Sequence, residues 1–350
     1  MTRMIRQSMV AYATPLCETV AETPEPRGTE VLVRISRCGV CHSDLHLHDG
    51  YFSLGGDKKL DVTAFRSLPF TLGHEIAGVV EKAGPEADVT AGTSAAVFPW
   101  IGCGQCAACK AGEENLCAAP RHLGIQVDGG FATHVLVPHP RYLIDHGSLP
   151  ASLAGAYMCS GLTAFAALKR LTDHAKRGPI LLVGLGGVGM MGLAIALAMF
   201  PHKPIIADID AAKREAALKA GAAAAYDSAD PNARRALLKA TGGVAGAVDF
   251  AGTDGSLAFA TGSIAKGGKV VITGLIGGSF ATPIAMFPLK AMTIEGTMTG
   301  TLAEAEEMMA LARAGKIPPV PIHERPLAAA QASLDDLRAG KIVGRVVLVP

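Results

Sequence analysis

The sequence predicts an α/β protein in two parts, a β-rich first part followed by a doubly wound parallel sheet. Residues 1–150 contain short β-like runs separated by glycine and proline, at 30–35, 77–81, 132–137 and 141–144. From about residue 178, short apolar runs alternate with helical patterns, which is typical of β-α-β units in a parallel sheet. The 350 residues are enough for two hydrophobic cores.

The alternating pattern defines the second part element by element. Predicted strands and helices follow one another at 180–183, 189–200, 205–208, 211–220, 246–250, 257–264 and 269–273. The alanine-rich stretch 216–225 completes one helix and enters the next strand. A short helix over 304–314 then leads to a strand-like tail at 345–349. We therefore predict domains at 1–154 and 155–294, with 295–350 returning to the first domain.

Charge and hydropathy exclude several classes of partner. The chain has 32 lysines and arginines against 31 acidic residues, a net charge of +1, and no long charged block. We therefore expect neither a nucleic-acid partner nor a membrane partner. The N-terminus has no continuous apolar segment, so we expect no signal peptide. The uncharged segment 180–200 is as long as a membrane span. Its five glycines favour a strand, a tight turn and a buried helix instead.

Four of the eight cysteines lie close together, at Cys103, Cys106, Cys109 and Cys117. Thiolates with two-residue spacers and one longer spacer can surround a tetrahedral zinc ion, and a closed four-cysteine set is the usual structural form. No coordination position is left open, so this zinc should hold a lobe together without reacting. In a large chain, clustered cysteines favour metal over disulfides, which indicates the reducing cytoplasm.

A second metal site is suggested by scattered residues. A catalytic zinc needs about three protein ligands and one open position. The candidates are Cys41 in the run Cys41-His42-Ser43-Asp44-Leu45-His46, His74 in Gly73-His74-Glu75, and Cys159. Each taken singly is more often a core residue or a satisfied hydrogen-bonding group. Together with the four-cysteine loop, and in this order, they resemble the zinc-containing alcohol dehydrogenases of the medium-chain dehydrogenase/reductase family across essentially the whole chain.

That resemblance implies a GroES-like catalytic domain, a Rossmann domain and the reversible oxidation of an alcohol to an aldehyde or ketone. It implies that Cys41, His74 and Cys159 hold the catalytic zinc, so that each chain binds two zinc ions. Glu75 corresponds to an acidic residue behind the metal, and Asp44 to the carboxylate that orients the histidine ligand. The other two thiols, Cys38 and Cys17, are interpreted as structural.

The resemblance also implies a proton path. Ser43 corresponds to the hydroxyl residue that touches the substrate alcohol, and His46 to the histidine that passes the proton to solvent. A hydroxyl can accept and donate at once, and an imidazole titrates near neutral pH. His42 resembles the basic residue that approaches the cofactor pyrophosphate.

A glycine-rich loop follows the apolar run 180–183 and opens a helix. This context makes the pattern a dinucleotide-binding fingerprint, because the glycines let backbone N–H groups approach a pyrophosphate. Its candidate cofactor-binding residues are Gly184, Gly186, Gly187, Val188 and Gly189.

The choice of cofactor depends on Asp208, which ends the run 205–208. A carboxylate there accepts hydrogen bonds from the ribose hydroxyls and repels a 2′-phosphate, which favours NAD over NADP. Asp210 is a weaker competitor for that role. Lys213 resembles a residue that contacts the adenosine ribose, Arg345 resembles an arginine near the pyrophosphate, and Thr273 is a further cofactor-binding candidate.

The segment between His46 and His74 is about a dozen residues longer than the resemblance leads one to expect. One hypothesis is that it folds over the substrate cleft, with Tyr51 or Phe52 lining the pocket. The alternative is a surface excursion. Trp100, the only tryptophan, is a candidate wall of the substrate site or a core residue.

Two other classes of protein are disfavoured. A zinc-free quinone or enoyl reductase would lack Cys41, His74 and the four-cysteine loop, and a non-enzymatic NAD- and zinc-binding protein should lose Ser43 and His46. The substrate stays open among primary alcohols, secondary alcohols and polyols. The resemblance implies a homodimer or homotetramer.

Overall fold

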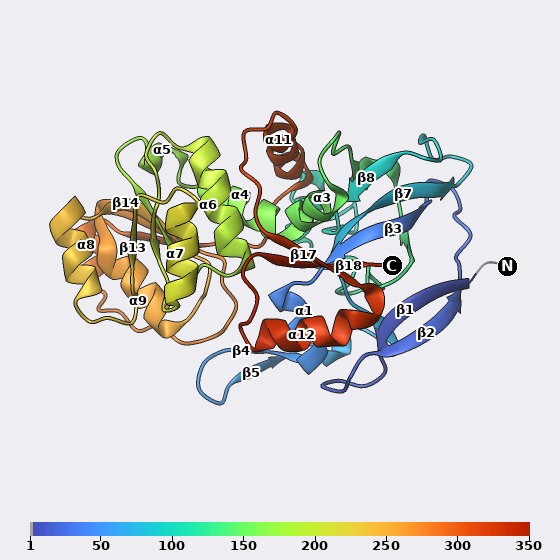
Figure 1. Ribbon diagram of the computed structural model, residues 1–350, viewed down its shortest axis with the longest axis horizontal. Helices are drawn as coiled ribbons and strands as arrows, with labels where there is room; N and C mark the ends of the chain where they lie inside the picture. The colour runs from blue at the N-terminus through green and yellow to red at the C-terminus, as the bar shows by residue number, and fades with distance from the viewer. Residues whose placement is uncertain (1–2) are drawn as a thin grey trace.

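The computed structural model describes residues 3–350 and divides into two lobes that lie side by side (Figure 1). One lobe is built on a seven-stranded sheet and a small three-stranded sheet, and the other on a six-stranded parallel sheet. This confirms the predicted fold class, a β-rich domain followed by a doubly wound α/β domain.

The first domain contains the two mixed or antiparallel sheets. The small sheet has the order β2-β1-β6, from β1 (Arg3–Met9), β2 (Cys17–Glu22) and β6 (Phe70–Thr71). The large sheet has the order β10-β8-β7-β3-β18-β17, and β9 also pairs with β3. Its strands are β3 (Val31–Gly39), β7 (Glu75–Ala83), β8 (Ser94–Val97), β9 (His134–Val137), β10 (Leu143–Ile144), β17 (Ile322–Pro326) and β18 (Arg345–Val349). A hairpin of β4 (Tyr51–Ser53) and β5 (Lys59–Asp61) stands apart from both sheets.

The second domain has the strand order β13-β12-β11-β14-β15-β16, with all neighbours parallel. This is the order of a dinucleotide-binding Rossmann sheet. All four residues of the central strand β11 are buried, as expected for a strand covered on both faces. The strands are β11 (Ile180–Val183), β12 (Ile205–Ala207), β13 (Ala224–Tyr226), β14 (Val244–Asp249), β15 (Ile264–Ile272) and β16 (Thr293–Gly296).

Helices cover both faces of this sheet. Alternate residues of β11 point to opposite sides, so that Leu181 and Val183 pack against α8 and α9, whereas Leu182 packs with the core under α4 and α6. The helices of the parallel-sheet domain are α5 (Thr172–Ala175), α6 (Gly187–Met199), α7 (Ala211–Lys219), α8 (Ala233–Thr241), α9 (Asp254–Ser263) and α10 (Met286–Lys290).

The remaining helices flank or join the sheets. They are α1 (His42–Asp49), α2 (Ala107–Lys110), α11 (Leu302–Arg313), α12 (Ala330–Arg338) and the short 3₁₀ turns η1 (Thr63–Phe65), η2 (Glu114–Leu116), η3 (Pro140–Tyr142) and η5 (Leu327–Ala329). The sequence reasoning did not predict α12 or β17, which occupy the segment between the predicted helix and the tail.

A long apolar helix joins the two domains. It runs through α3 (Ala151–Ala156), a π-helical turn η4 (Tyr157–Gly161) and α4 (Leu162–Lys169). Within residues 3–350 it is the one helix long and apolar enough to cross a membrane, yet 89% of its most apolar window is buried inside the protein. The predicted boundary between residues 154 and 155 falls inside this helix, and β16 extends two residues past the predicted boundary at 294.

The C-terminal segment returns to the first domain. In β18, Val347 pairs with Gly39 and Leu348 with Cys38 of β3, so the last strand of the chain lies beside one of the first. Figure 1 shows these red C-terminal strands next to blue β3. The segment 180–200, weighed above as a membrane span, is the buried strand β11 followed by α6.

Candidate active site

The structure brings together three ligand-type side chains that are far apart in sequence. One ligand atom each from Cys41, His74 and Cys159 lies within 4.8 Å of the others, and all three residues are buried. The two sulfurs are 3.9 Å apart. A tetrahedral zinc ion with Zn–S bonds of 2.3 Å holds two sulfurs about 3.8 Å apart. The donor set and its spacing therefore fit a zinc ion.

Asp44 fixes the positions of two of these ligands. Its carboxylate accepts hydrogen bonds from the backbone N–H of Cys41 at 2.8 Å and of Gly73 at 3.3 Å. It also lies 3.3 Å from Nδ1 of His74. Both ring nitrogens are buried, and neither forms a hydrogen bond among the described residues, although Nδ1 faces the Asp44 carboxylate. A carboxylate behind one nitrogen leaves the other free to bind a metal, which is the usual arrangement of a histidine ligand.

Cys159 reaches the site from an irregular turn. It lies in the π-helical turn η4, in the middle of the long helix that joins the domains. Single π-helical turns inside α-helices often occur at functional sites because they displace one residue from the regular helix surface. The hydrogen bond between the two thiols lowers the pKa of Cys41 well below its usual range, so one thiolate is favoured even without a metal.

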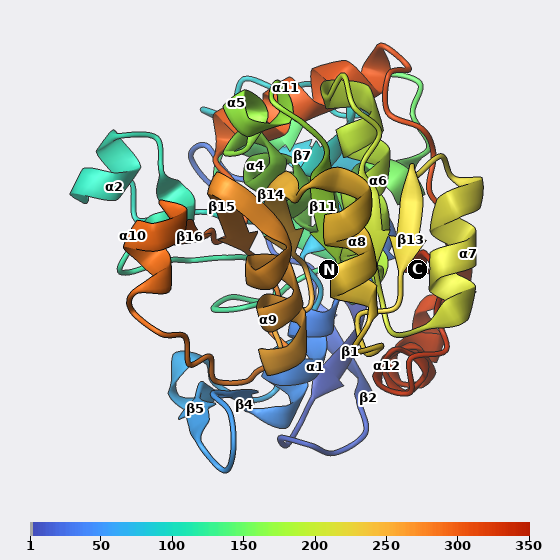
Figure 2. The same cartoon turned by 90° about the vertical axis from the view of Figure 1, so that its left-hand side faces the viewer.

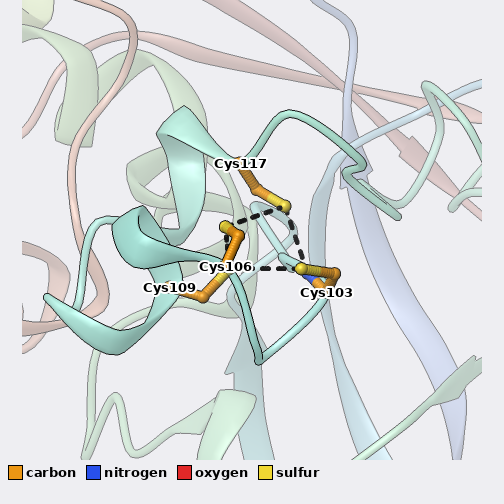
Figure 3. A group of neighbouring side chains, drawn as sticks. All are labelled: Cys103, Cys106, Cys109 and Cys117. Carbon is orange, nitrogen blue, oxygen red and sulfur yellow. Dashed lines mark hydrogen bonds between the residues drawn. The ribbon is translucent and has the colours of Figure 1, made fainter.

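Four further cysteines, Cys103, Cys106, Cys109 and Cys117, form a separate cluster (Figure 3). Their sulfur–sulfur distances are 3.5 Å for Cys106–Cys109, 3.8 Å for Cys106–Cys117 and 4.0 Å for Cys103–Cys109. These values bracket the separation of about 3.8 Å that tetrahedral zinc requires. The Cys117 sulfur also accepts hydrogen bonds from the backbone N–H of Cys103 and Ala119. Such N–H donors stabilise a thiolate, so this cluster also fits zinc.

A single cavity of about 910 Å³ connects the two domains. At one end it is lined by Cys41 and Cys159, and at the other by the glycine-rich loop and Asp208. The predicted metal site and the predicted cofactor site therefore open into the same space. Trp100 forms part of the wall, with its ring 5.6 Å from that of His74 and its indole N–H bonded to the Met158 carbonyl at 2.9 Å.

Comparison with known proteins agrees with this geometry. Residues 27–146 match the family model described as an alcohol dehydrogenase GroES-like domain, and residues 187–314 match the one described as a zinc-binding dehydrogenase. NAD-dependent alcohol dehydrogenases of Sulfurisphaera tokodaii and Saccharolobus solfataricus are each 35% identical to this chain over 98% of its length and 99% of theirs. The chain belongs to the zinc-containing alcohol dehydrogenases of the medium-chain dehydrogenase/reductase family. This membership confirms the predicted enzyme class, an oxidoreductase.

Solved structures show the same relationship. The alcohol dehydrogenase of the hyperthermophilic archaeon Aeropyrum pernix has a TM-score of 0.85 at 28% identity, covering 99% of this chain and all of that one. The D-arabinose dehydrogenase of Sulfolobus solfataricus has a TM-score of 0.85 at 25% identity, with both chains fully covered. One of these proteins is thus named as an alcohol dehydrogenase and the other as a dehydrogenase of a sugar.

In this dehydrogenase, Glu75 and Arg345 form a buried ion pair directly behind the metal site. Nη2 of Arg345 donates to Oε2 of Glu75 at 2.5 Å and to the Val40 carbonyl at 3.0 Å. The other carboxylate oxygen accepts from the Ser160 N–H at 3.2 Å. Burial raises the pKa of Glu75 to about 7, and the arginine partly opposes that rise.

Arg345 also lies beside the glycine-rich loop. A Cβ placed on Gly187 would come within 2.4 Å of Nη1 of Arg345. The guanidinium therefore stands between the metal site and the loop, but Arg345 is not among the cavity-lining residues. The sequence predicted that Arg345 lies near the cofactor pyrophosphate, and the structure does place it beside the glycine-rich loop. Its hydrogen-bonded side-chain partner, however, is Glu75.

The residues of the predicted proton path lie together on α1. His42, Ser43 and His46 all line the cavity. The ring of His46 packs against that of Phe52, with centroids 4.8 Å apart, and its Nε2 has no hydrogen-bond partner within the described chain. Burial lowers the pKa of His46, so the neutral imidazole that accepts a proton is favoured.

The cofactor end of the cavity is built on close backbone packing. Gly184 has a φ of +87°, and a Cβ on Gly189 would lie 1.9 Å from the Gly184 carbonyl oxygen. Only glycine fits at both positions. One oxygen of Asp208 accepts from the Leu185 N–H at 2.5 Å and the other from the Asp210 N–H at 2.8 Å. The remaining predicted residues Gly186, Gly187, Val188, Lys213 and Thr273 also line the cavity.

Asp210, the competitor considered for the ribose, has a different place. Its side chain accepts hydrogen bonds from the backbone N–H groups of Ala212 and Lys213. It therefore caps the N-terminus of α7, a common role for aspartate.

The long segment after His46 forms the β4–β5 hairpin and the turn η1. Its Phe52, Leu60, Val62 and Phe65 line the cavity. Tyr51 does not; its ring instead faces Nζ of Lys59, 3.8 Å away. A Cβ on Gly55 at the hairpin tip would lie 2.7 Å from the Gly278 carbonyl carbon, so the tip touches the parallel-sheet domain. Figure 2 shows the hairpin beside the loop between β15 and α10. This placement favours the lid hypothesis over a surface excursion.

Sequence reasoning missed the contribution of the four-cysteine lobe to the cavity. The cavity wall includes Asn115 and Leu116, which lie just before Cys117, and His122, Ile125 and Gln126, which follow it. Arg66, from the segment after η1, also lines the wall. Only their nearness to the cysteines could have drawn attention to them, because they form no recognisable motif.

Proposed function

We propose that the protein is a cytoplasmic, NAD-dependent alcohol dehydrogenase that binds two zinc ions per chain, one catalytic and one structural. The observation that carries the proposal is the shared cavity, which joins Cys41 and Cys159, clustered with His74, to the glycine-rich loop and Asp208. Bound zinc would supply the Lewis acidity that favours loss of the alcohol proton, and NAD would accept the hydride.

The chain's own residues prepare the alcohol for this reaction. We assign Ser43 to holding the substrate hydroxyl, because its side chain lies on the cavity wall and can accept and donate at once. His46, one helical turn further along α1, takes up the proton and passes it to solvent. Trp100 and Phe52 form apolar walls that exclude water from the reacting carbon.

Cofactor choice rests on Asp208. Its buried carboxylate is held by two backbone N–H groups at the end of β12 and faces the cavity, where it would accept hydrogen bonds from ribose hydroxyls. A 2′-phosphate would meet a fixed negative charge. The relatives named as NAD-dependent alcohol dehydrogenases support the same choice.

The four-cysteine zinc would stabilise the lobe from residue 103 to residue 117, since all four positions are occupied by thiols. We further propose that the enzyme is a homodimer or homotetramer that assembles through the parallel-sheet domain, as the family resemblance implies.

A panel of primary, secondary and polyhydric alcohols tests the proposal, with NAD and NADP compared and bound zinc measured by atomic emission. We expect two zinc ions per chain, turnover with NAD, and loss of turnover on chelation. Cys41→Ser should abolish turnover and leave NAD affinity nearly unchanged. Cys17→Ser, at an exposed cysteine outside both clusters, is the matched control and should behave like the wild type. Full turnover by the Cys41 variant would refute the ligand assignment.

A further inference from the structure

His122 is a buried polar side chain on the cavity wall without a partner. Its exposure is 1%, and neither ring nitrogen forms a hydrogen bond to any residue in the range 3–350. The Glu114 backbone lies near the ring but does not meet hydrogen-bond geometry. Buried polar groups are nearly always hydrogen-bonded, because an unmet group loses its hydration without compensation. An unpartnered imidazole in a substrate cavity therefore points to a ligand atom.

Asn115 offers a second unpartnered atom on the same wall. Its Nδ2 donates to the Met298 carbonyl at 2.8 Å, which fixes the orientation of the amide because the opposite orientation would set two oxygens against each other. The amide oxygen is thereby left buried without a partner among the described residues. Asn115 is 5% exposed and lines the cavity.

The two side chains together favour a hydroxyl group. Burial lowers the pKa of His122 to about 4, so the ring is neutral at pH 7 and carries one donor and one acceptor. The oxygen of Asn115 is an acceptor only. A ligand group that can both donate and accept satisfies this set, whereas a carboxylate or an ether cannot donate to the amide oxygen.

The location of His122 relative to the metal site indicates what kind of substrate could reach both. The Trp100 ring neighbours both, 5.6 Å from the His74 ring and 5.3 Å from the His122 ring, measured between centroids. Leu116, Ile125 and other apolar side chains line the cavity nearby. An apolar carbon chain can therefore run from the metal site along Trp100 to His122.

We propose that His122 and Asn115 bind a second hydroxyl group of the substrate, so that the enzyme prefers diols over alcohols with one hydroxyl. The inference rests on the proposed alcohol dehydrogenase activity and names its substrate class. His122 and Asn115 act on specificity, since the reacting hydroxyl is held at the other end of the carbon chain.

The test compares kcat/KM for diols from propane-1,3-diol to hexane-1,6-diol with that for the primary alcohol of the same chain length. We expect one chain length at which the wild type prefers the diol by about fivefold or more, as one net hydrogen bond provides. His122→Phe keeps the ring and removes both nitrogens, so it should remove that preference and retain turnover of the simple alcohol. His122→Gln, which can still donate and accept, should keep most of it.

His134→Phe is the matched control, because this histidine does not line the cavity, and its diol preference should equal that of the wild type. If His122→Phe does not fold, Asn115→Leu serves for the same comparison and should lower the diol preference. Turnover of simple alcohols with no diol preference at any length would overturn this inference and leave the proposed function intact. A preference for ω-hydroxy acids over diols would also overturn the inference. It would indicate that the substrate carries a carboxylate bound by Arg66, whose Nη2 is also unpartnered in the described chain. Absence of turnover with every alcohol would overturn both.

Discussion

Removing one partner of the buried pair between Glu75 and Arg345 should strongly destabilise the first domain. Arg345 is 3% exposed and Glu75 is fully buried. Replacing Arg345 by Met keeps a long apolar stem but leaves one carboxylate oxygen of Glu75 without its donor. The other oxygen keeps only the Ser160 N–H at 3.2 Å.

The expected loss follows from the burial of both partners. Removing one partner of a buried ion pair typically costs about 3–5 kcal/mol, because the other charge is left out of water or must be neutralised by a proton. Since the pKa of Glu75 is already about 7, protonation is accessible, and the loss should lie near the lower end of that range. The double variant Glu75→Gln with Arg345→Met removes that charge, so it should recover part of the loss and give a coupling energy of at least about 1 kcal/mol. The exposed pair between Arg313 and Asp145 has a similar length, 2.8 Å, and serves as control; Arg313→Met should cost less than about 1 kcal/mol.

Urea denaturation with excess zinc measures these values at constant metal loading. Trp100 is the only tryptophan, is 3% exposed and lies in the first domain, so its fluorescence reports the unfolding of that domain. A loss for Arg345→Met no larger than that for Arg313→Met would refute the reasoning, as would a double variant whose loss equals the sum of the two single losses.

Four further outcomes are expected. Cys117→Ser should lose one of two zinc ions, measured by metal analysis, and about 3 kcal/mol or more of stability. Gly189→Ala should weaken NAD binding at least about tenfold in a fluorescence titration, since its Cβ would lie 1.9 Å from the Gly184 oxygen. Asp208→Ser should raise the NADP to NAD ratio of kcat/KM about a hundredfold, because it removes about 3 kcal/mol of repulsion at roughly 5 Å. Deleting residues 56–66 should change the preference between short and long alcohols at least about fivefold; unchanged preference would contradict the lid.

Local patterns explain why the parallel sheet and the four-cysteine cluster could be predicted. The run 180–183 is a short apolar strand followed by a glycine turn, and β11 occupies those residues. The spacing of Cys103, Cys106, Cys109 and Cys117 determines their approach within a single loop. In both cases the residues that interact are near each other in sequence, so the local sequence pattern is enough to predict the structure.

The catalytic set could not be derived from spacing. Cys41 precedes α1, His74 precedes β7 and Cys159 lies in the middle of a helix, so only the packed domain brings them together. The three ligands were predicted only because the order of the motifs along the chain resembles that of the family. The joining helix itself was missed, because burial of 89% of its apolar window leaves no polar face and hence no helical period in the sequence. The partner of Arg345 was equally hidden, since Glu75 is supplied by a strand 270 residues earlier.

The cavity gives the four-cysteine cluster a second role. Its sulfurs leave no position for a substrate, so from sequence the cluster has only a structural role. In the structure, however, Asn115 and Leu116 lie inside the loop that the cluster closes, and both form the cavity wall. Asn115 also donates to the Met298 carbonyl, two residues past the last strand of the parallel sheet, and so ties this wall to the segment that follows that sheet. Zinc in the four-cysteine site would therefore fix the shape of the substrate cavity as well as the fold of the lobe.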